Sequence, residues 1–231
     1  FAMGAAQPAA NPFYETVVFG SRAEWKVNSV LVDMMVNTND PRLPIYAEKA
    51  SDGTYRGKPS GFKNLPSAAY GYKNISAIGA KFLKPDAPGF FMSYAELCFF
   101  LAEARFRGLI STGSAEDYYV EGIRASLSSH GISSADIATY TAIVAYDPAN
   151  ALKQIGEQKW LSLFGQGIET WTEWRRTKVP ALTAAAEAVL TEIPSRYQYP
   201  TTEQSLNKAN YDAAIARQGA DLLTTKLWWL P

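Results

Sequence analysis

From Ser93 onward the sequence repeats the start and stop signals of short α-helices, and this feature restricts the fold more than any other. Ser93 and Glu96 have the spacing of a capping box, in which the serine side chain satisfies an N–H group at the start of a helix. Gly108 readily takes the left-handed conformation in which helices end. The sequence therefore predicts a helix between Ser93 and Gly108, and the small Ala95 and Ala102 leave room for a neighbouring helix.

Apolar residues recur at helical spacing within this predicted helix and indicate the side that packs inward. We assign the inward face to Tyr94, Leu97, Cys98, Leu101 and Arg105. Cys98 is the only cysteine, so it has no disulfide partner within the chain. Because a free thiol in an apolar pattern behaves as a small hydrophobic group, we expect Cys98 to lie in the core.

Similar signals predict more helices downstream. Ser114 and Asp117 mark the start of the next helix, and Asp147 followed by Pro148 marks another. The predicted helices lie at residues 114–131, 147–165, 168–176 and 207–216, and an extended stretch is predicted at 224–229. A short connection makes consecutive helices antiparallel. Such pairs indicate a tetratricopeptide-like arrangement, although the sequence has no fixed internal period.

Residues 1–92 differ, because glycine, proline and asparagine turn signals interrupt them throughout. One helix is predicted there, with apolar residues from Val27 to Met35, and residues 37–40 end it. We therefore expect a mainly α protein with tetratricopeptide-like antiparallel helix pairs and a loop-rich irregular region. Residues 1–92 would form the loop-rich, ligand-facing part, and residues 93–231 the helical part. No apolar run approaches the ~18 residues of a transmembrane helix.

Composition argues against several functions. Lys plus Arg and Asp plus Glu both number 22, so the net charge is zero and no basic field is available to attract nucleic acid. One His and one Cys are too few for a zinc site, and the glycine motifs that bind phosphate are absent. We predict no cofactor and no metal site. His130 falls at a predicted helix end, where a partly charged imidazole would complement the helix carbonyls.

Oxygen-bearing side chains gather at Asp33, Asn37, Asn39 and Asp40, which raises the alternative of a calcium site. Their spacing does not match the calcium-binding loop of EF-hands. A turn that ends the helix explains the same residues, because Asn and Asp favour such turns. We prefer this turn interpretation.

One enzymatic alternative stays open. Glycoside hydrolysis requires two suitably spaced carboxyl groups, and Glu169 and Glu173 lie one helical turn apart beside Trp171 and Trp174. Aromatic neighbours raise the pKa of a carboxyl group. Residues 175–176 are both arginine, however, and neighbouring Glu and Arg on a helix more often form ordinary ion pairs. We therefore favour a protein that is not an enzyme.

Several segments resemble the SusD/RagB family, in its SusD-like branch, and they occur in the family's order. Residues 194–229 are similar to the closing signature of that family. Residues 94–104 resemble the helix that opens a tetratricopeptide-like pair, and residues 40–44, Asp-Pro-Arg-Leu-Pro, resemble its loop-rich half. The residues assigned to this structural signature are Glu96, Glu103, Arg196, Tyr197, Pro200, Asn207, Tyr211, Lys226 and Trp228.

The closing signature is interpreted first as structural. Arg196 can stack on Tyr197 and Tyr199 and pair with a carboxylate such as Glu203. Asn207 is expected to cap the last helix. Lys226 and the two tryptophans at 228–229 are expected to seal the end of the chain against the domain.

The resemblance implies a surface-exposed outer-membrane lipoprotein that captures glycans and delivers them to a SusC-like TonB-dependent transporter. Membrane association would come only from an amino-terminal lipid anchor outside this stretch. Because residues 1–3 carry no basic region, apolar segment or lipidation cysteine, we expect the targeting segment to have been removed. Members of this family are longer, so we expect one continuous domain that lacks its amino-terminal half.

A sugar-capturing site requires exposed aromatic faces for stacking and polar groups for the hydroxyls. Aromatic residues form 13% of this chain, so it has enough aromatic side chains to supply such stacking faces. We place it in the loop-rich part, where several aromatics stand beside turn residues instead of at core spacing. The predicted ligand-binding residues are Trp25, Tyr55, Arg56, Tyr70, Tyr72 and Asn74, with Asn28 as a further candidate. A helical scaffold that binds only protein is the third alternative.

Overall fold

A computed structural model describes residues 3–231. Phe1 and Ala2, on which the prediction of a removed targeting segment partly rests, lie outside the described residues. The α-helices are α1 (Ser29–Asn37), α2 (Leu43–Tyr46), α3 (Ser67–Tyr70), α4 (Tyr94–Phe106), α5 (Ala115–Ser129), α6 (Ser134–Ile143), α7 (Ala151–Ser162), α8 (Gly167–Thr177), α9 (Thr201–Leu206) and α10 (Lys208–Gln218). Shorter turns are the π-helical η1 (Tyr14–Phe19) and the 3₁₀ segments η2 (Tyr72–Asn74), η3 (Ala80–Leu83) and η4 (Pro148–Asn150).

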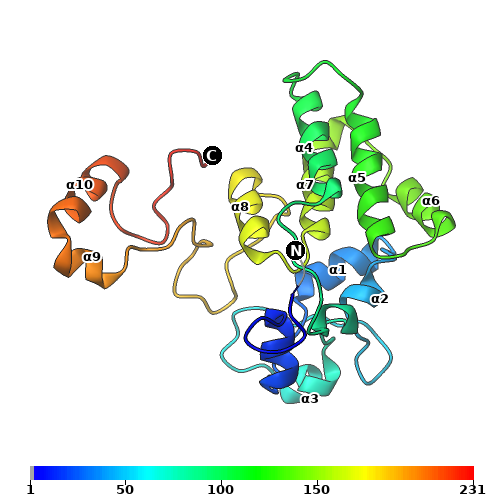
Figure 1. Cartoon of the computed structure of the whole chain (residues 1–231), viewed down its shortest axis with the longest axis horizontal. Coiled ribbons are helices and arrows are strands. Elements are labelled where there is room, and N and C mark those ends of the chain that lie inside the picture. The colour runs from blue at the N-terminus through cyan, green and yellow to red at the C-terminus, as the bar shows by residue number, and fades with distance from the viewer. Residues whose placement is uncertain (1–2) are drawn as a thin grey trace.

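The prediction of a mainly α protein with tetratricopeptide-like helix pairs is confirmed. Within residues 3–231 the β pairing is limited to isolated bridges. Helices α4 and α5 pack side by side as an antiparallel pair, with α7 against α4 and α6 against α5 (Figure 1). Gly122 allows this close approach, because a Cβ atom there would lie 2.7 Å from the ring of Phe99.

The predicted helix boundaries are confirmed where caps define them. The Ser93 hydroxyl accepts a hydrogen bond from the Glu96 N–H at 3.1 Å, and the Ser114 hydroxyl accepts one from the Asp117 N–H at 3.0 Å. Gly108 and Gly131 follow the two helices with φ values of +73° and +77°. These short-range signals are local, which is why the sequence reveals them.

The predicted inward face of α4 is partly wrong. Cys98 is buried as expected, but Tyr94 and Leu97 are 60% and 41% exposed, and Ala95, Phe99 and Ala102 are buried with Cys98 instead. The face was misassigned because α4 carries apolar residues on all sides, so its sequence defines no single apolar stripe.

Other predictions require smaller corrections. The short helices α6 and α9 were not predicted. Asp147 caps the 3₁₀ turn η4, and α7 follows this turn. Residues 224–229 form turns and irregular backbone instead of one extended stretch.

The loop-rich part has its own core, which extends to the helical part. Val32, Met35 and Tyr46 are fully buried there, and α1 begins one residue after Asn28, which caps it. The ring of Tyr46 stacks on Phe164 at a centroid distance of 4.4 Å, with the planes 13° apart. The two parts therefore share one continuous packed boundary.

Candidate functional site

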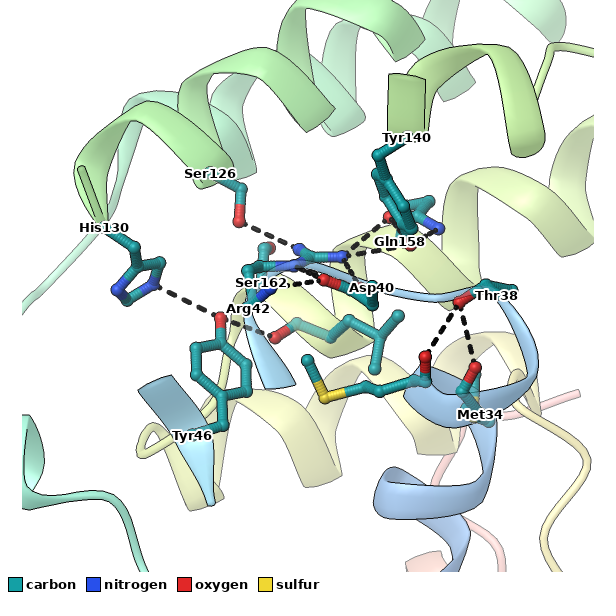
Figure 2. Close-up of polar contacts among 12 residues, drawn as sticks. Met34, Thr38, Asp40, Arg42, Tyr46, Ser126, His130, Tyr140, Gln158 and Ser162 are labelled. Atoms are coloured by element: carbon teal, nitrogen blue, oxygen red, sulfur yellow. Dashed lines mark hydrogen bonds and ion pairs between the residues drawn. The ribbon is translucent and has the colours of Figure 1, made fainter. Parts of the chain in front are cut away.

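A buried arginine joins the loop-rich part to three helices of the helical part. Arg42 is 0% exposed, and its guanidinium pairs with Asp40 at 2.5 Å. Its Nη1 donates to the hydroxyl of Ser126 on α5 at 2.9 Å, and its Nη2 donates to Oε1 of Gln158 on α7 at 3.0 Å and to the hydroxyl of Tyr140 on α6 at 3.3 Å (Figure 2). We call these five side chains the Arg42 hub.

The hub has the electrostatics of a structural element. Burial alone would lower the pKa of Arg42, but the adjacent Asp40 carboxylate more than offsets this and raises it above its usual value. The Asp40 carboxylate also accepts a hydrogen bond from the Arg42 N–H at 2.9 Å. Asn39 has a φ of +50°, as expected for a residue in a turn after a helix. The turn interpretation of residues 37–40 agrees with this geometry, and no cluster of three potential metal ligands occurs among residues 3–231.

His130 lies beside the hub and is neutral, which corrects the expectation of a partly charged imidazole. Its Nε2 lies 3.3 Å from the Tyr46 hydroxyl, and its Nδ1 lies 2.9 Å from Nζ of Lys81. Burial, together with the positive charge of Lys81, lowers the pKa of His130 to about 4. The ring thus links α2, η3 and the end of α5 through hydrogen bonds without carrying charge at neutral pH.

Glu173, one of the two carboxylates of the enzymatic alternative, is held in buried ion pairs. Glu173 is buried and accepts hydrogen bonds from Nζ of Lys159 at 3.0 Å and from Nη2 of Arg176 at 2.8 Å. Arg176 also pairs with Glu103 of α4 at 2.5 Å. The ordinary ion-pair interpretation therefore describes Glu173, whose buried carboxylate ties α8 to α7.

Two of the predicted ligand residues, Arg56 and Asn28, lie on a frame of three adjacent backbone segments, and Trp25, Tyr55 and Asn74 each stand next to one of these segments in sequence. Residues 26–28, 56–58 and 75–78 are joined by isolated bridges and backbone hydrogen bonds. The Arg56 N–H donates to the Ser76 hydroxyl at 3.1 Å, and the Ser76 N–H donates to the Arg56 carbonyl at 2.8 Å. Arg56 is thereby fixed in position without a helix or a sheet.

Arg56 is the centre of a polar group on this frame. Its Nη1 donates to the Asn74 carbonyl at 3.0 Å, and its Nη2 donates to Asp52 at 2.9 Å. The Arg56 and Asp52 side chains are 39% and 45% exposed. Hydrogen bonds from Thr54, supported by Arg56, lower the pKa of the Asp52 carboxyl to about 2. We call Asp52, Arg56 and Asn74, together with the exposed Tyr72 two residues before Asn74 in sequence, the Arg56 surface.

The predicted aromatic residues differ in how far they are exposed. Tyr72 is 60% exposed and stands two residues before Asn74, whereas Tyr55 and Tyr70 are half-buried. Trp25 is 45% exposed, and its ring packs edge-to-face against that of Phe13 at a centroid distance of 6.5 Å. Tyr72 and Trp25 are thus the two exposed aromatic residues among the predicted ligand residues.

The two asparagine candidates are already engaged within the chain. The Asn74 amide donates to the Ala68 carbonyl at 2.8 Å and accepts from the Ser51 hydroxyl at 3.3 Å. The Asn28 side chain accepts from the Val30 N–H at 2.8 Å as the cap of α1. Both side chains hold the backbone frame, so the Arg56 guanidinium and the Asp52 carboxylate are the more accessible polar groups.

Sequence reasoning missed a cavity of about 690 Å³ between the 81–95 segment, the end of α5 and residues 162–166. Its walls are largely aromatic and aliphatic, and its polar groups include Lys81, His130 and Gln166. The apolar walls include Phe13, Phe82, Phe90, Met92, Tyr94 and Phe164. The run Phe90–Met92 was the available signal, because apolar residues rarely adjoin in an exposed loop without a function.

The closing signature is held by a carboxylate other than the expected one. Arg196 pairs with Asp221 at 3.1 Å, not with Glu203, and stacks over the ring of Tyr199 at 5.0 Å. The Tyr211 hydroxyl donates to the same Asp221 at 3.3 Å. Asp221 lies within residues 194–229, but its pairing with Arg196 was not predicted, because a pair that spans 25 positions has no local pattern.

Two signature residues, Asn207 and Trp228, do not have the structural roles predicted for them. Asn207 precedes α10, but its side chain bonds Glu203 and Asn210 and does not cap the helix. Trp228 is 95% exposed and does not seal the chain end, whereas Trp229 lies over Arg175 at 5.0 Å. Among the other signature residues, Pro200 precedes α9. Tyr197 packs edge-to-face on Trp171. The Nζ atom of Lys226 donates a hydrogen bond to the Pro231 carbonyl.

Taken together, the paired helices and the irregular loop-rich part define a mainly helical, tetratricopeptide-like protein. The model of a family described as SusD-like, starch-binding and associating with the outer membrane matches residues 1–200. The chain belongs to this SusD-like family, and the predicted resemblance is confirmed. None of the described helices is long and apolar enough to cross a membrane. No curated protein sequence matched.

Solved structures support the same assignment. A SusD homologue from Bacteroides fragilis is 26% identical, with a TM-score of 0.82 over 100% of this chain and 57% of its own. A second from the same species is 28% identical, with a TM-score of 0.78 over 99% and 56%. A chitin-binding SusD homologue from Flavobacterium johnsoniae, at 23% identity and a TM-score of 0.83 over 97% and 53%, shares the fold. The chain spans about half the length of these structures.

Proposed function

We propose that this chain is the carboxy-terminal part of a surface-exposed, outer-membrane glycan-binding lipoprotein that captures oligosaccharides without cleaving them. In this proposal the bound glycan passes to a SusC-like TonB-dependent transporter. Membership of a family described as starch-binding and associating with the outer membrane supports the proposal, as do relatives named for chitin binding. The observation that carries it in this chain is the Arg56 surface.

The chemistry of that surface suits a sugar. Sugar rings present apolar C–H faces that stack on flat side chains, and their hydroxyls require donors and acceptors. Tyr72 offers an exposed ring two residues before Asn74, while Arg56 supplies donors and Asp52, paired with Arg56, an ionised acceptor. Because the frame is fixed by hydrogen bonds to Ser76 and Asn74, little conformational entropy is lost on binding.

Binding experiments test the proposal directly. Starch and chitin oligosaccharides would be titrated into the wild type and into Tyr72→Ala, with affinity measured by calorimetry. Loss of one stacking ring predicts an affinity roughly threefold to tenfold lower for Tyr72→Ala. Trp25→Ala tests the second aromatic position. Tyr197→Ala is the control, because Tyr197 is 71% exposed in a different part of the chain.

The alternatives give different results. Release of reducing ends during these titrations, abolished by Glu173→Gln, would establish hydrolysis and overturn the non-catalytic proposal. If no panel glycan binds either this chain or a longer natural chain that contains it, binding of protein partners alone would be the better interpretation. Co-purification of the lipidated protein with a TonB-dependent barrel tests the partner.

A further inference from the structure

Positive charge is concentrated in one stretch of the loop-rich part, although the chain as a whole is neutral. Residues 43–84 contain seven Lys or Arg residues and only two Asp or Glu residues. One of these two acids, Asp52, is already paired with Arg56. The stretch therefore carries an excess of positive charge that its own carboxylates do not balance.

The backbone frame brings Lys58 of this stretch next to Lys26. Asn28 forms a parallel bridge with Lys58, and Lys26 forms an antiparallel bridge with Ala77. Alternate residues of an extended segment point to the same side, so Lys26 and Asn28 share one side, and Lys58 lies on that side opposite Asn28. Val27, between them, is 3% exposed and points into the core, whereas both lysines are only half-buried. The two lysines thus lie on the outer side of the frame.

A glycine permits the close approach that fixes Lys58 in this place. Gly57 is buried, and a Cβ atom there would lie 2.2 Å from the Cα atom of Ser29. The Lys58 N–H donates to the Val27 carbonyl at 2.7 Å, and the Ser29 N–H donates to the Lys58 carbonyl at 3.0 Å. Because its backbone is bonded on both sides, Lys58 does not depend on a flexible loop for its position.

The two lysines repel each other and have no counter-ion. Burial, together with the positive charge of Lys58, lowers the pKa of Lys26. Among residues 3–231 neither ammonium group forms an ion pair or a hydrogen bond. The charge of Lys58 also acts on the Glu24 carboxylate, but Glu24 forms its ion pair with Arg22. A bound anion would offset the repulsion between the two ammonium groups, so this side of the frame favours a negatively charged ligand.

An exposed aromatic side chain adjoins the lysines. Trp25 directly precedes Lys26 and is 45% exposed. A sugar ring can stack on an indole, and an acidic substituent of the sugar can accept hydrogen bonds from an ammonium group. Such charge-assisted hydrogen bonds are about twice as strong as those between neutral groups. The combination of Trp25 with two cations suits a sugar that carries a negative charge.

We infer that the glycan bound by the loop-rich part is acidic, and that Lys26 and Lys58 bind its carboxylate or sulfate groups. This inference rests on the proposed function, because it names the class of glycan that is captured. A neutral oligosaccharide would leave both cations without a counter-ion, whereas a uronic acid or a sulfated sugar supplies one.

Calorimetric titration of the full-length natural protein that contains these residues tests the inference. Oligogalacturonate presents carboxylates and a dextran sulfate oligosaccharide presents sulfates, while maltohexaose and chitohexaose are neutral. We expect at least one acidic probe to bind about tenfold more tightly than either neutral probe. The double variant Lys26→Gln with Lys58→Gln should bind that acidic probe roughly tenfold more weakly than the wild type, because both charge-assisted contacts are lost.

Lys153→Gln is the matched control, because it removes the same charge from α7, where Lys153 pairs with Glu157 at 3.5 Å. It should leave the affinity for the acidic probe unchanged, and circular dichroism checks that each variant is folded. Equal affinities for acidic and neutral probes would overturn the inference while glycan capture stands, as would acidic binding that persists in the double variant. If neither kind of glycan binds the full-length protein, the proposed function fails as well.

Discussion

Two arginine–aspartate pairs lie in the loop-rich part, and they differ in burial and therefore in the role we assign to each. Both side chains of the Arg42–Asp40 pair are 0% exposed, whereas those of the Arg56–Asp52 pair are 39% and 45% exposed. Arg42 reaches three helices of the helical part, while Arg56 bonds only its own loop frame. The same chemical pair thus joins two parts of the fold in one place and presents charge to solvent in the other.

The largest expected effect comes from breaking the buried pair. Arg42→Met leaves the Asp40 carboxylate without its cation in a site closed to water, and removal of one partner of a buried pair costs about 3–5 kcal/mol. Urea denaturation monitored by tryptophan fluorescence would measure the change in the free energy of unfolding. The double variant Asp40→Leu with Arg42→Met sharpens the result, because it leaves no buried charge and should be more stable than Arg42→Met alone.

A smaller effect is expected in the ion-pair cluster that joins α4, α7 and α8. Lys159→Met removes the cation between Glu173 and Glu96, but Arg176 still pairs with Glu173. Loss of a charge-assisted hydrogen bond costs about 1.5–3 kcal/mol, so this variant should be less destabilised than Arg42→Met. The same urea titration compares the two, and an equal or greater loss for Lys159→Met would show that Arg176 does not compensate.

The neutral His130 predicts a dependence of stability on pH. Its folded-state pKa of about 4 lies below the ordinary histidine pKa of 6.5, so between these values the unfolded chain binds a proton that the folded chain does not. The free energy of unfolding therefore falls as the pH drops from 6.5 towards 4. His130→Gln removes the titrating group, and thermal unfolding across this window should show a shallower slope for that variant. Parallel slopes would contradict the assignment of a neutral His130.

The sequence revealed those features that depend on neighbours in the chain. Ser93, Ser114 and Gly108 were identified because a cap involves residues a few positions apart. The inward face of α4 was misassigned because Leu97 and Ala95 are both compatible with a core, and only the arrangement of α5 and α7 decides between them. The Arg42 hub spans up to 116 positions, from Arg42 to Gln158, and no local pattern encodes such a contact.

The candidate site shows the same limit. Tyr72 and Trp25 were selected because they stand beside turn residues, and both are exposed. Asn74 was proposed as a ligand for hydroxyls, yet its amide binds Ala68 and Ser51, since an irregular backbone needs side chains to satisfy its polar groups.

The smallest effect on stability is expected at the exposed pair. Arg56→Met is the same substitution as Arg42→Met, but exposed ion pairs contribute only about 0–1 kcal/mol because water and salt screen them. The urea midpoint should move little, while glycan affinity should fall, because the variant removes the donors that face the sugar hydroxyls and leaves Tyr72 in place. Calorimetric titration with the oligosaccharide that binds the wild type measures this second quantity. If Arg56→Met instead unfolds the protein as readily as Arg42→Met, both pairs are structural, and the distinction drawn from their burial is wrong.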